Sequence, residues 1–138
     1  TMRVNNSEER YDLNLATVDQ LLRISGIGNY YAKTIVEKRS MLGSFVKLDQ
    51  LADLMPDSLY RKVLPRLTLS PKPVKRLDIN TVDLPLLQQY PGLKYKAAII
   101  INYRNNHGAF HSLHDLWKVE GIRKYILDKL APYLDFGS

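Results

Sequence analysis

The sequence predicts an all-α fold made of two similar helical units, and three observations support this. Apolar residues recur at helical spacing, as in Ala32, Ile35 and Val36. No segment shows the strict alternation of apolar and polar residues that marks a half-buried strand. The pattern of the first half also returns in the second half of the chain, which indicates an internal duplication.

The duplication sets the expected domain boundaries. The first block of matches has an offset of 66 positions and pairs Asn14, Thr17, Leu21, Gly26 and Ile27 with Asn80, Asp83, Leu87, Gly92 and Leu93. The offset then falls to 65, where Ala32, Arg39, Gly43 and Phe45 match Ala97, Arg104, Gly108 and Phe110. We expect an N-terminal segment at 1–11, a first unit at 12–69, a basic linker with two prolines at 70–76 and a second unit at 77–135.

Composition places the chain among globular proteins and permits a polyanionic partner. The 138 residues are 45% hydrophobic and 25% charged, with a net charge of +6. There is no cysteine, which excludes disulfides and thiolate metal sites. No apolar run approaches the roughly 20 residues that cross a bilayer, so we expect no direct membrane contact by this segment.

The first helix of each unit has a recognisable start. Thr17 followed by Gln20 is typical of a capping box, and the helix is expected to end near Ser25 and Gly26. In the second unit Pro85 is tolerated in the first helical turn if Asp83 is the N-cap. The two units therefore share one start point.

The later elements follow in the same order in both units. A helix through Ala32 and Arg39 is expected to end before Gly43, and further helices are expected around Leu48–Leu54 and Leu59–Leu67. Arg39 and its counterpart Arg104 lie near helix ends, where they suit either the helix dipole or a phosphate. Trp117 is expected in the core of the second unit.

The turn Gly26-Ile27-Gly28 carries the clearest chemistry. Gly26 is expected to adopt a positive φ that ends the first helix, and Gly28 to leave room for an approaching backbone, with Ile27 in the core. The amides of Gly28, Asn29 and Tyr30 would then be unpaired first-turn donors, and the helix dipole favours an anion there. Lys33, one turn farther on, adds positive charge, so this turn predicts a phosphate site.

The order of Asn14, Gly26-Ile27-Gly28, Ala32, Arg39 and Phe45 resembles the ComEA family of competence DNA receptors, and the resemblance covers both units. It implies two tandem helix-hairpin-helix units of SAM-like fold in an exported bacterial protein. It also implies binding of double-stranded DNA without sequence preference, for delivery to DNA-uptake machinery proteins. The location implied is periplasmic or extracytoplasmic, with an upstream segment as the membrane anchor. The implied DNA contacts are Gly26, Ile27, Gly28 and Lys33, with Asn29 and Tyr30 as neighbours.

The matching turn of the second unit departs from this pattern. It keeps Gly92, has Lys94 in place of a second glycine, and is one residue shorter. Lys94 and Lys96 either replace amide contacts by side-chain charge or are solvated lysines on a turn kept for packing. Whether this turn binds DNA is left open.

Other interpretations are weaker. His107, His111 and His114 suggest a metal site, but Gly108 separates them and no carboxylate cluster supports them, so neither metal nor cofactor is expected. Without paired acids or a nucleophile with a base, we expect no enzyme activity and no small-molecule substrate. The aromatic residues Tyr30, Tyr31, Tyr95 and Tyr103 are expected to pack rather than stack on bases. The alternative function is a protein-interaction or assembly module without DNA binding.

Overall fold

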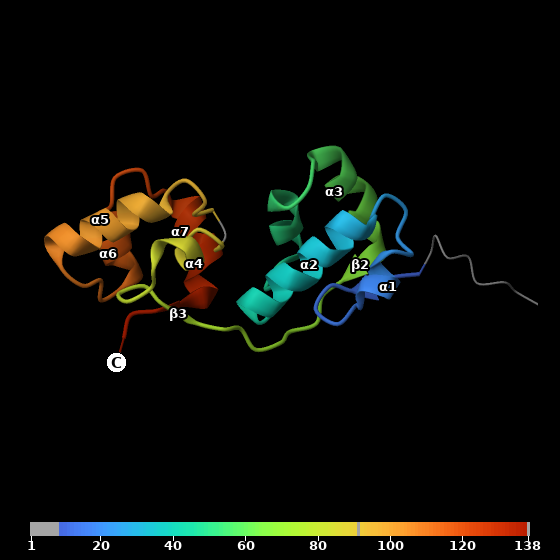
Figure 1. Ribbon diagram of the computed structural model, residues 1–138, viewed down its shortest axis with the longest axis horizontal. Helices are drawn as coiled ribbons and strands as arrows, with labels where there is room; N and C mark the ends of the chain where they lie inside the picture. Colours follow the sequence, from blue (N-terminus) through green and yellow to red (C-terminus); the bar gives the residue numbers. More distant parts are fainter. Residues whose placement is uncertain (1–8, 91, 138) are drawn as a thin grey trace, which may run out of the picture. The chain divides into compact units, whose positions relative to one another are not determined.

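The computed structural model describes residues 9–90 and 92–137, so most of the N-terminal segment expected at 1–11 lies outside the described residues. The chain divides between Val74 and Lys75 into two compact units, here called unit 1 and unit 2 (Figure 1). Each unit is described by itself.

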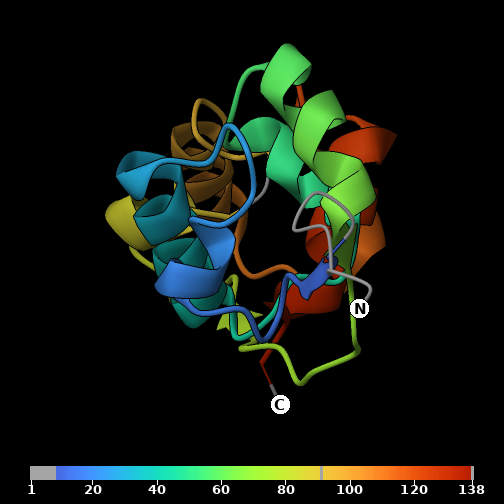
Figure 2. The ribbon, with the colours of Figure 1, turned by 90° about the vertical axis from the view of Figure 1, so that its right-hand side faces the viewer.

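Unit 1 is mainly helical, with one long helix (Figures 1 and 2). Its elements are β1 (Tyr11–Asp12), α1 (Val18–Leu21), α2 (Asn29–Leu42), the 3-10 helix η2 (Leu48–Asp53), α3 (Asp57–Val63), the 3-10 helix η3 (Leu64–Arg66) and β2 (Leu67–Thr68).

Unit 2 repeats this order with a shorter central helix. Its elements are β3 (Leu77–Asp78), α4 (Leu84–Leu87), α5 (Ala97–His107), α6 (Leu113–Trp117), α7 (Lys124–Leu130), the 3-10 helix η4 (Ala131–Tyr133) and β4 (Leu134–Asp135).

The expected helical fold is confirmed, but it is not strictly all-α. In unit 1, β1 pairs in parallel with β2, and in unit 2, β3 pairs with β4. These pairs join the start of each unit to its end, with Tyr11 opposite Leu67 and Leu77 opposite Leu134. Each strand has only two residues, too few to show alternation in the sequence.

The helix starts are confirmed, and the first helix is shorter than expected. Thr17 and Gln20 form the reciprocal capping box, with Thr17 Oγ1 3.1 Å from Gln20 N. Asp83 caps α4 through its side chain. Helix α1 ends at Leu21, because the next amides form shorter-range turns, such as Ile24 N to Leu21 O at 3.0 Å. The segment expected as a helix at Leu48–Leu54 is the 3-10 helix η2.

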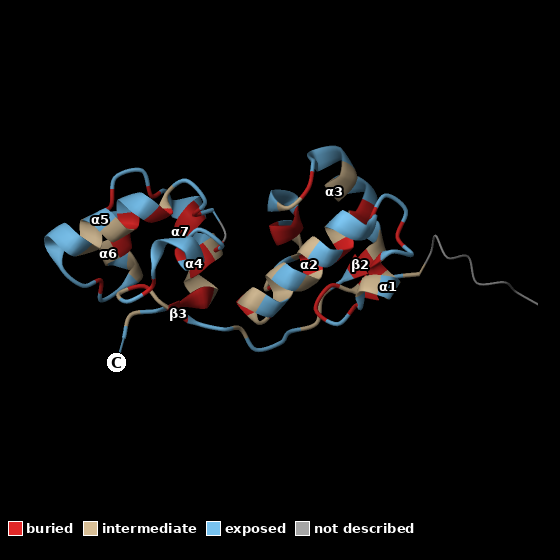
Figure 3. Cartoon of the chain, in the orientation of Figure 1, coloured by how far each residue is buried: buried red, intermediate tan, exposed pale blue. Residues whose placement is uncertain are grey.

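Each unit has its own apolar core, shown in red in Figure 3. Helices contribute one face each to these cores. The fully buried apolar side chains of unit 1 include Leu13, Leu21, Ile35, Leu42, Phe45 and Leu51, and those of unit 2 include Ile79, Leu87, Leu93, Ile100, Phe110 and Leu116.

The repeated asparagines connect distant parts of each unit. The Asn14 side chain donates to Phe45 O at 2.9 Å and to Ser70 O at 2.7 Å, and its Oδ1 accepts from Phe45 N at 2.8 Å. Asn80 bonds Phe110 in the same two ways. A side-chain amide carries both a donor and an acceptor, so it can pair with the N–H and the C=O of one buried residue that lies outside the helices and strands.

The repeated arginines are structural as well. Arg39 Nη1 donates to the carbonyl oxygens of Leu13 and Ala16, at 3.0 and 2.8 Å. In unit 2 Arg104 Nη1 bonds Ile79 O and Val82 O in the same way, at 3.0 and 2.9 Å. These guanidinium groups therefore hold the loop before the first helix of each unit, which favours the structural alternative over phosphate contact.

The expectation for Trp117 is wrong, because its side chain is 54% exposed. Its neighbour Leu116 is fully buried, and Val119 is only 1% exposed. Successive residues of a helix point about 100° apart, so Leu116 occupies the buried face and turns Trp117 outwards.

The start of the expected linker is held against unit 1. Ser70 O accepts the hydrogen bond from Asn14, and Lys72 O accepts one from Ser44 Oγ at 2.8 Å.

Within residues 9–90 and 92–137, no helix is both long enough and apolar enough to span a membrane.

Candidate nucleic-acid interface

The Gly26 turn, defined here as Ile24–Gly28, is built from two buried side chains and one left-handed glycine. Ile24 and Ile27 are 1% and 4% exposed, and Ile27 N donates to Ile24 O at 3.0 Å. Gly26 between them has φ +98°, which confirms the expected positive φ. A Cβ at this position would also lie 2.6 Å from Leu59 Cδ1. Gly26 is therefore required by the fold itself.

Gly28 differs from Gly26 in its backbone and surroundings. It is the N-cap of α2, with φ −96° and ψ −172°, an extended conformation that any residue adopts. Apart from its chain neighbours, no described part of the protein comes within 4 Å of a Cβ placed there. No internal packing demands this glycine, and the open space on its α-carbon faces outwards.

The amides beside this open space lack acceptors within the described chain. The first backbone bond at this end of α2 is Ala32 N to Gly28 O, at 3.0 Å. Gly28, Asn29 and Tyr30 are all exposed, and within residues 9–90 and 92–137 no side chain caps the start of α2 with a hydrogen bond. The first turn also contains no acidic residue. Three outward amides and the positive end of a 14-residue helix dipole therefore meet at one exposed place.

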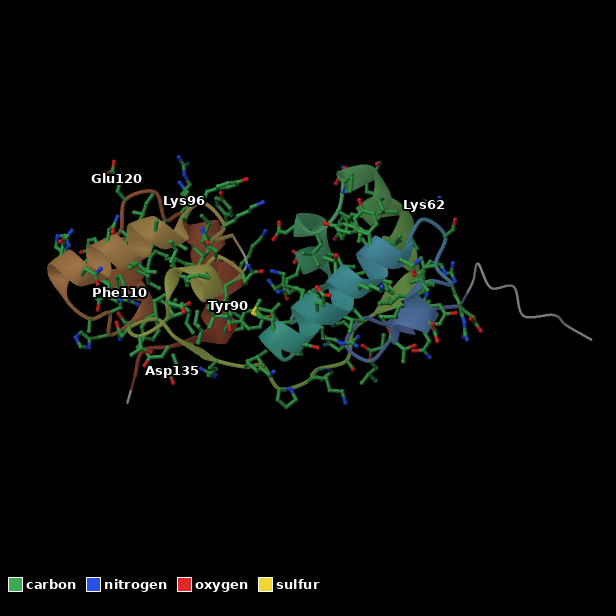
Figure 4. All side chains as sticks on the ribbon, viewed as in Figure 1. Lys62, Tyr90, Lys96, Phe110, Glu120 and Asp135 are labelled. Carbon is green, nitrogen blue, oxygen red and sulfur yellow. The ribbon has the colours of Figure 1, made fainter. Side chains whose placement is uncertain are left out.

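Two lysines add charge near this turn. Lys33 is exposed on α2, one turn beyond the amides. Lys62 comes from α3, and its Nζ lies 3.8 Å from a Cβ placed on Gly26 (Figure 4). Sequence inspection did not find Lys62, because it lies in another element 36 positions away and has no motif of its own. Only the packing of α3 against the turn brings it there.

The predicted residues of the second unit do not form the same arrangement. Gly92 has φ +78°, but the next helix, α5, begins only at Ala97. Its N-cap, Lys96, has φ −110° and ψ −13°, a helical rather than an extended conformation. Lys96 N and Ala97 N both donate to Leu93 O, at 3.1 and 3.0 Å. The Ala97 bond has a counterpart in unit 1, where Ala32 N donates to Gly28 O, but the Lys96 bond closes a turn just before α5 that the start of α2 lacks.

The lysines of the Gly92 turn have separate surroundings. Lys94 is exposed, and its Nζ lies 5.4 Å from the centre of the Tyr95 ring. Lys96 is half-buried, and its Nζ lies 3.2 Å from a Cβ placed on Gly121 in the connection between α6 and α7. The structure therefore does not bring Lys94 and Lys96 together as a copy of the Gly26 site.

The remaining candidates are placed as follows. The described residues contain no group of three potential metal ligands, and the His107 ring stacks on Tyr103 at 4.1 Å between centroids. Tyr103 also stacks on Phe110, so it packs as expected. Tyr30 and Tyr95 are exposed instead, at 72% and 82%.

Comparison with known proteins supports a nucleic-acid-binding role. The sequence profile of the helix-hairpin-helix motif matches residues 6–56 and 73–135. The chain is also similar to the endonuclease/exonuclease/phosphatase family domain-containing protein 1 of Mus musculus and of Rattus norvegicus, each 30% identical, and of Homo sapiens, 29% identical. Each match covers 90% of this chain but 27% of the relative, so the chain spans about a quarter of the length of these relatives.

Proposed function

Because the chain belongs to the helix-hairpin-helix family, we propose that it binds double-stranded DNA through backbone phosphates, without sequence preference. The observation that carries the proposal is the open space at Gly28, bordered by the exposed amides of Asn29 and Tyr30. A phosphate oxygen can approach these donors closely because no side chain intervenes. Lys33 and Lys62 supply charge to the same strand.

The binding mode follows from the groups available at the turn. Backbone amides and lysines recognise phosphate and sugar, which are the same at every base pair. Affinity is therefore independent of sequence and strongly dependent on salt. If about 2 to 5 phosphates are neutralised, log K falls against log salt with a slope of about −2 to −5.

The decisive variant is Gly28→Glu combined with Lys33→Glu. The extended backbone and open space at Gly28 accept a side chain, so the variant is expected to fold. It places two carboxylates at the phosphate site. Because several phosphate contacts should be lost together, we expect no measurable binding of a 30-base-pair duplex at about 0.1 M salt. Fluorescence anisotropy measures the affinity.

A matched control separates the site from net charge. Ser40→Glu with Lys75→Glu changes the charge by the same amount at two exposed positions outside the turn. This control should lose much less affinity. Equal losses in the two variants, or full affinity in the folded Gly28/Lys33 variant, would disprove the site. Absence of wild-type binding even at low salt would favour the protein-interaction alternative.

We propose a binding role rather than catalysis for this chain. The relatives' names mention nuclease and phosphatase domains, but the match covers only 27% of each relative. Delivery of DNA for uptake, partners in the uptake machinery and an extracytoplasmic location are proposals that rest on the ComEA resemblance.

A further inference from the structure

Two exposed tyrosines occupy the same position in the two units. Tyr30 stands two residues before Ala32, and Tyr95 stands two residues before Ala97, the matching residue of the repeat. Their exposed fractions, 72% and 82%, are the largest of any large hydrophobic side chain in residues 9–90 and 92–137. Ala32 and Ala97 are fully buried, so the alanines rather than the rings join the core. Packing inside each unit therefore does not explain the two tyrosines.

The tyrosine is kept where the other features of the two turns differ. Unit 1 has Asn29 before it and Tyr31 after it, whereas unit 2 has Lys94 and Lys96. The turn of unit 2 is also one residue shorter and lacks a second glycine. An exposed ring is thus common to two turns whose amides and cations are arranged differently, which indicates a role separate from the amide contacts.

Each ring contacts a neighbouring side chain and still faces solvent. The Tyr30 ring meets the half-buried Tyr31 ring edge to face, with centroids 5.2 Å apart and planes at 75°. Lys94 Nζ lies 5.4 Å from the centre of the Tyr95 ring, within the range of a cation–π contact. Tyrosine has only two side-chain torsions, so a ring restrained in this way loses little conformational entropy when a ligand packs on it.

Both rings lie next to groups that suit phosphate. Tyr30 carries one of the outward amides at the start of α2, and Lys33 lies one turn farther along this helix. Tyr95 lies between Lys94 and Lys96 in the chain. Proteins that bind single strands combine cations along the backbone with aromatic rings for the bases. A base is joined to its phosphate through one sugar, so a ring beside a phosphate site is placed to meet the base of the same strand.

We propose that Tyr30 and Tyr95 stack on unpaired bases, so that the chain also binds single-stranded DNA. In a duplex the faces of each base are covered by its neighbours and are reached only by unstacking, whereas a single strand exposes them. Stacking tolerates any sequence because every base has a flat aromatic face. The inference rests on the proposed function for the phosphate contacts of the Gly26 turn. It adds unpaired nucleotides as a ligand that those contacts alone do not favour.

The test compares a single strand with a duplex in the double variant Tyr30→Ala with Tyr95→Ala of the whole chain. The ligands are an oligothymidylate of about 30 nucleotides, which does not pair with itself, and a duplex of the same length. Each stacked base contributes about 5-fold to 150-fold to affinity, so losing both rings should weaken oligothymidylate binding at least about 25-fold. Duplex binding should change much less. Fluorescence anisotropy measures both affinities.

The salt dependence separates stacking from phosphate contacts. Stacking releases no counterions, so the alanine variant should lose the same factor in oligothymidylate affinity at every salt concentration and keep the slope of log K against log salt. Tyr30→Phe with Tyr95→Phe keeps both rings and should bind the single strand nearly as well as the wild type. Trp117→Ala removes a ring that is 54% exposed on α6, outside both turns, and should leave binding unchanged.

Unchanged oligothymidylate affinity in the folded alanine variant, an equal loss on the duplex, or a comparable loss from Trp117→Ala would overturn the inference. So would a phenylalanine variant as weak as the alanine variant. If the wild type binds the duplex but not the single strand, only this inference fails. If the Gly28/Lys33 variant keeps its duplex affinity while the alanine variant loses oligothymidylate, only the proposed phosphate site fails. If the wild type binds neither ligand at low salt, both fail together.

Discussion

Replacing Gly26 and Gly28 separately by alanine distinguishes the glycine that the fold needs from the glycine that binding needs. Gly26 has φ +98°, where an L-residue costs about 1–2 kcal/mol. Its new Cβ would also meet Leu59 Cδ1 at 2.6 Å. Moving the end of that side chain off its rotamer costs about 0.5–1.5 kcal/mol. Gly26→Ala should therefore destabilise unit 1 by about 2–3 kcal/mol.

The same substitution at Gly28 should be nearly neutral for stability. The backbone is extended, and the new Cβ meets open space. Alanine is a somewhat poorer N-cap than glycine, but it restricts the unfolded chain, and these effects offset each other to within about 1 kcal/mol. DNA affinity should nevertheless fall, because the methyl group occupies the space through which phosphate approaches the amides.

Thermal unfolding can be followed separately in the two units. The chain has a single tryptophan, Trp117, which lies in unit 2, so its fluorescence reports that unit while far-ultraviolet circular dichroism reports both. For a unit of this size, 2–3 kcal/mol corresponds to a fall in Tm of about 10–20 °C. Gly26→Ala should lower the dichroism transition of unit 1 and leave the tryptophan transition unchanged. Equal stability of Gly26→Ala and wild type, or equal damage from Gly28→Ala, would refute the reasoning.

Three further predictions concern the supports of unit 1. Asn14→Asp replaces the amide donor to Phe45 O by a carboxylate, and it should cost about 3–5 kcal/mol in urea denaturation; a loss below 1 kcal/mol would contradict the role of this amide. Arg39→Ala removes two charge-assisted hydrogen bonds and should cost about 2–3 kcal/mol, while the folded fraction keeps its DNA affinity, as anisotropy would show. Burial alone would raise the pKa of Asp12, but hydrogen bonds from Ser70 and Asn14 and the charge of Lys72 lower it below the ordinary 3.8. The folded pKa is depressed, so the stabilisation is present above pH 3.8 and is lost as pH falls through the folded pKa; Asp12→Asn should remove this dependence in acid-unfolding curves.

Local sequence signals predicted the features that depend on neighbouring residues. The capping box of Thr17 and Gln20, the cap at Asp83 and the positive φ of Gly26 each arise within a few residues, and each is present in the structure. The paired strands were missed because two residues carry no periodicity. The burial of Trp117 was predicted wrongly because Leu116, its neighbour on the short helix α6, occupies the buried face and turns Trp117 outwards.

A match between the two units can mark a residue that the fold needs or a residue that binds a ligand, and the sequence alone did not separate these two kinds. Asn14 and Arg39 match across the repeat because both units need the same hydrogen bonds to backbone carbonyls. Gly26 matches Gly92 because both turns need a left-handed residue. Each of these three matches has a structural role of its own, so the similarity of the units follows in part from folding alone.

The sequence by itself determined the helical class, the duplication, the position of the Gly26 turn and the net positive charge. Tertiary structure alone decided which charges belong to which turn. Lys62 reaches the Gly26 turn from α3, and Lys96, which precedes α5, reaches Gly121 in the connection between α6 and α7. The physical reason is that backbone conformation depends on adjacent residues, whereas a phosphate-binding surface depends on distances between side chains from helices far apart in the chain.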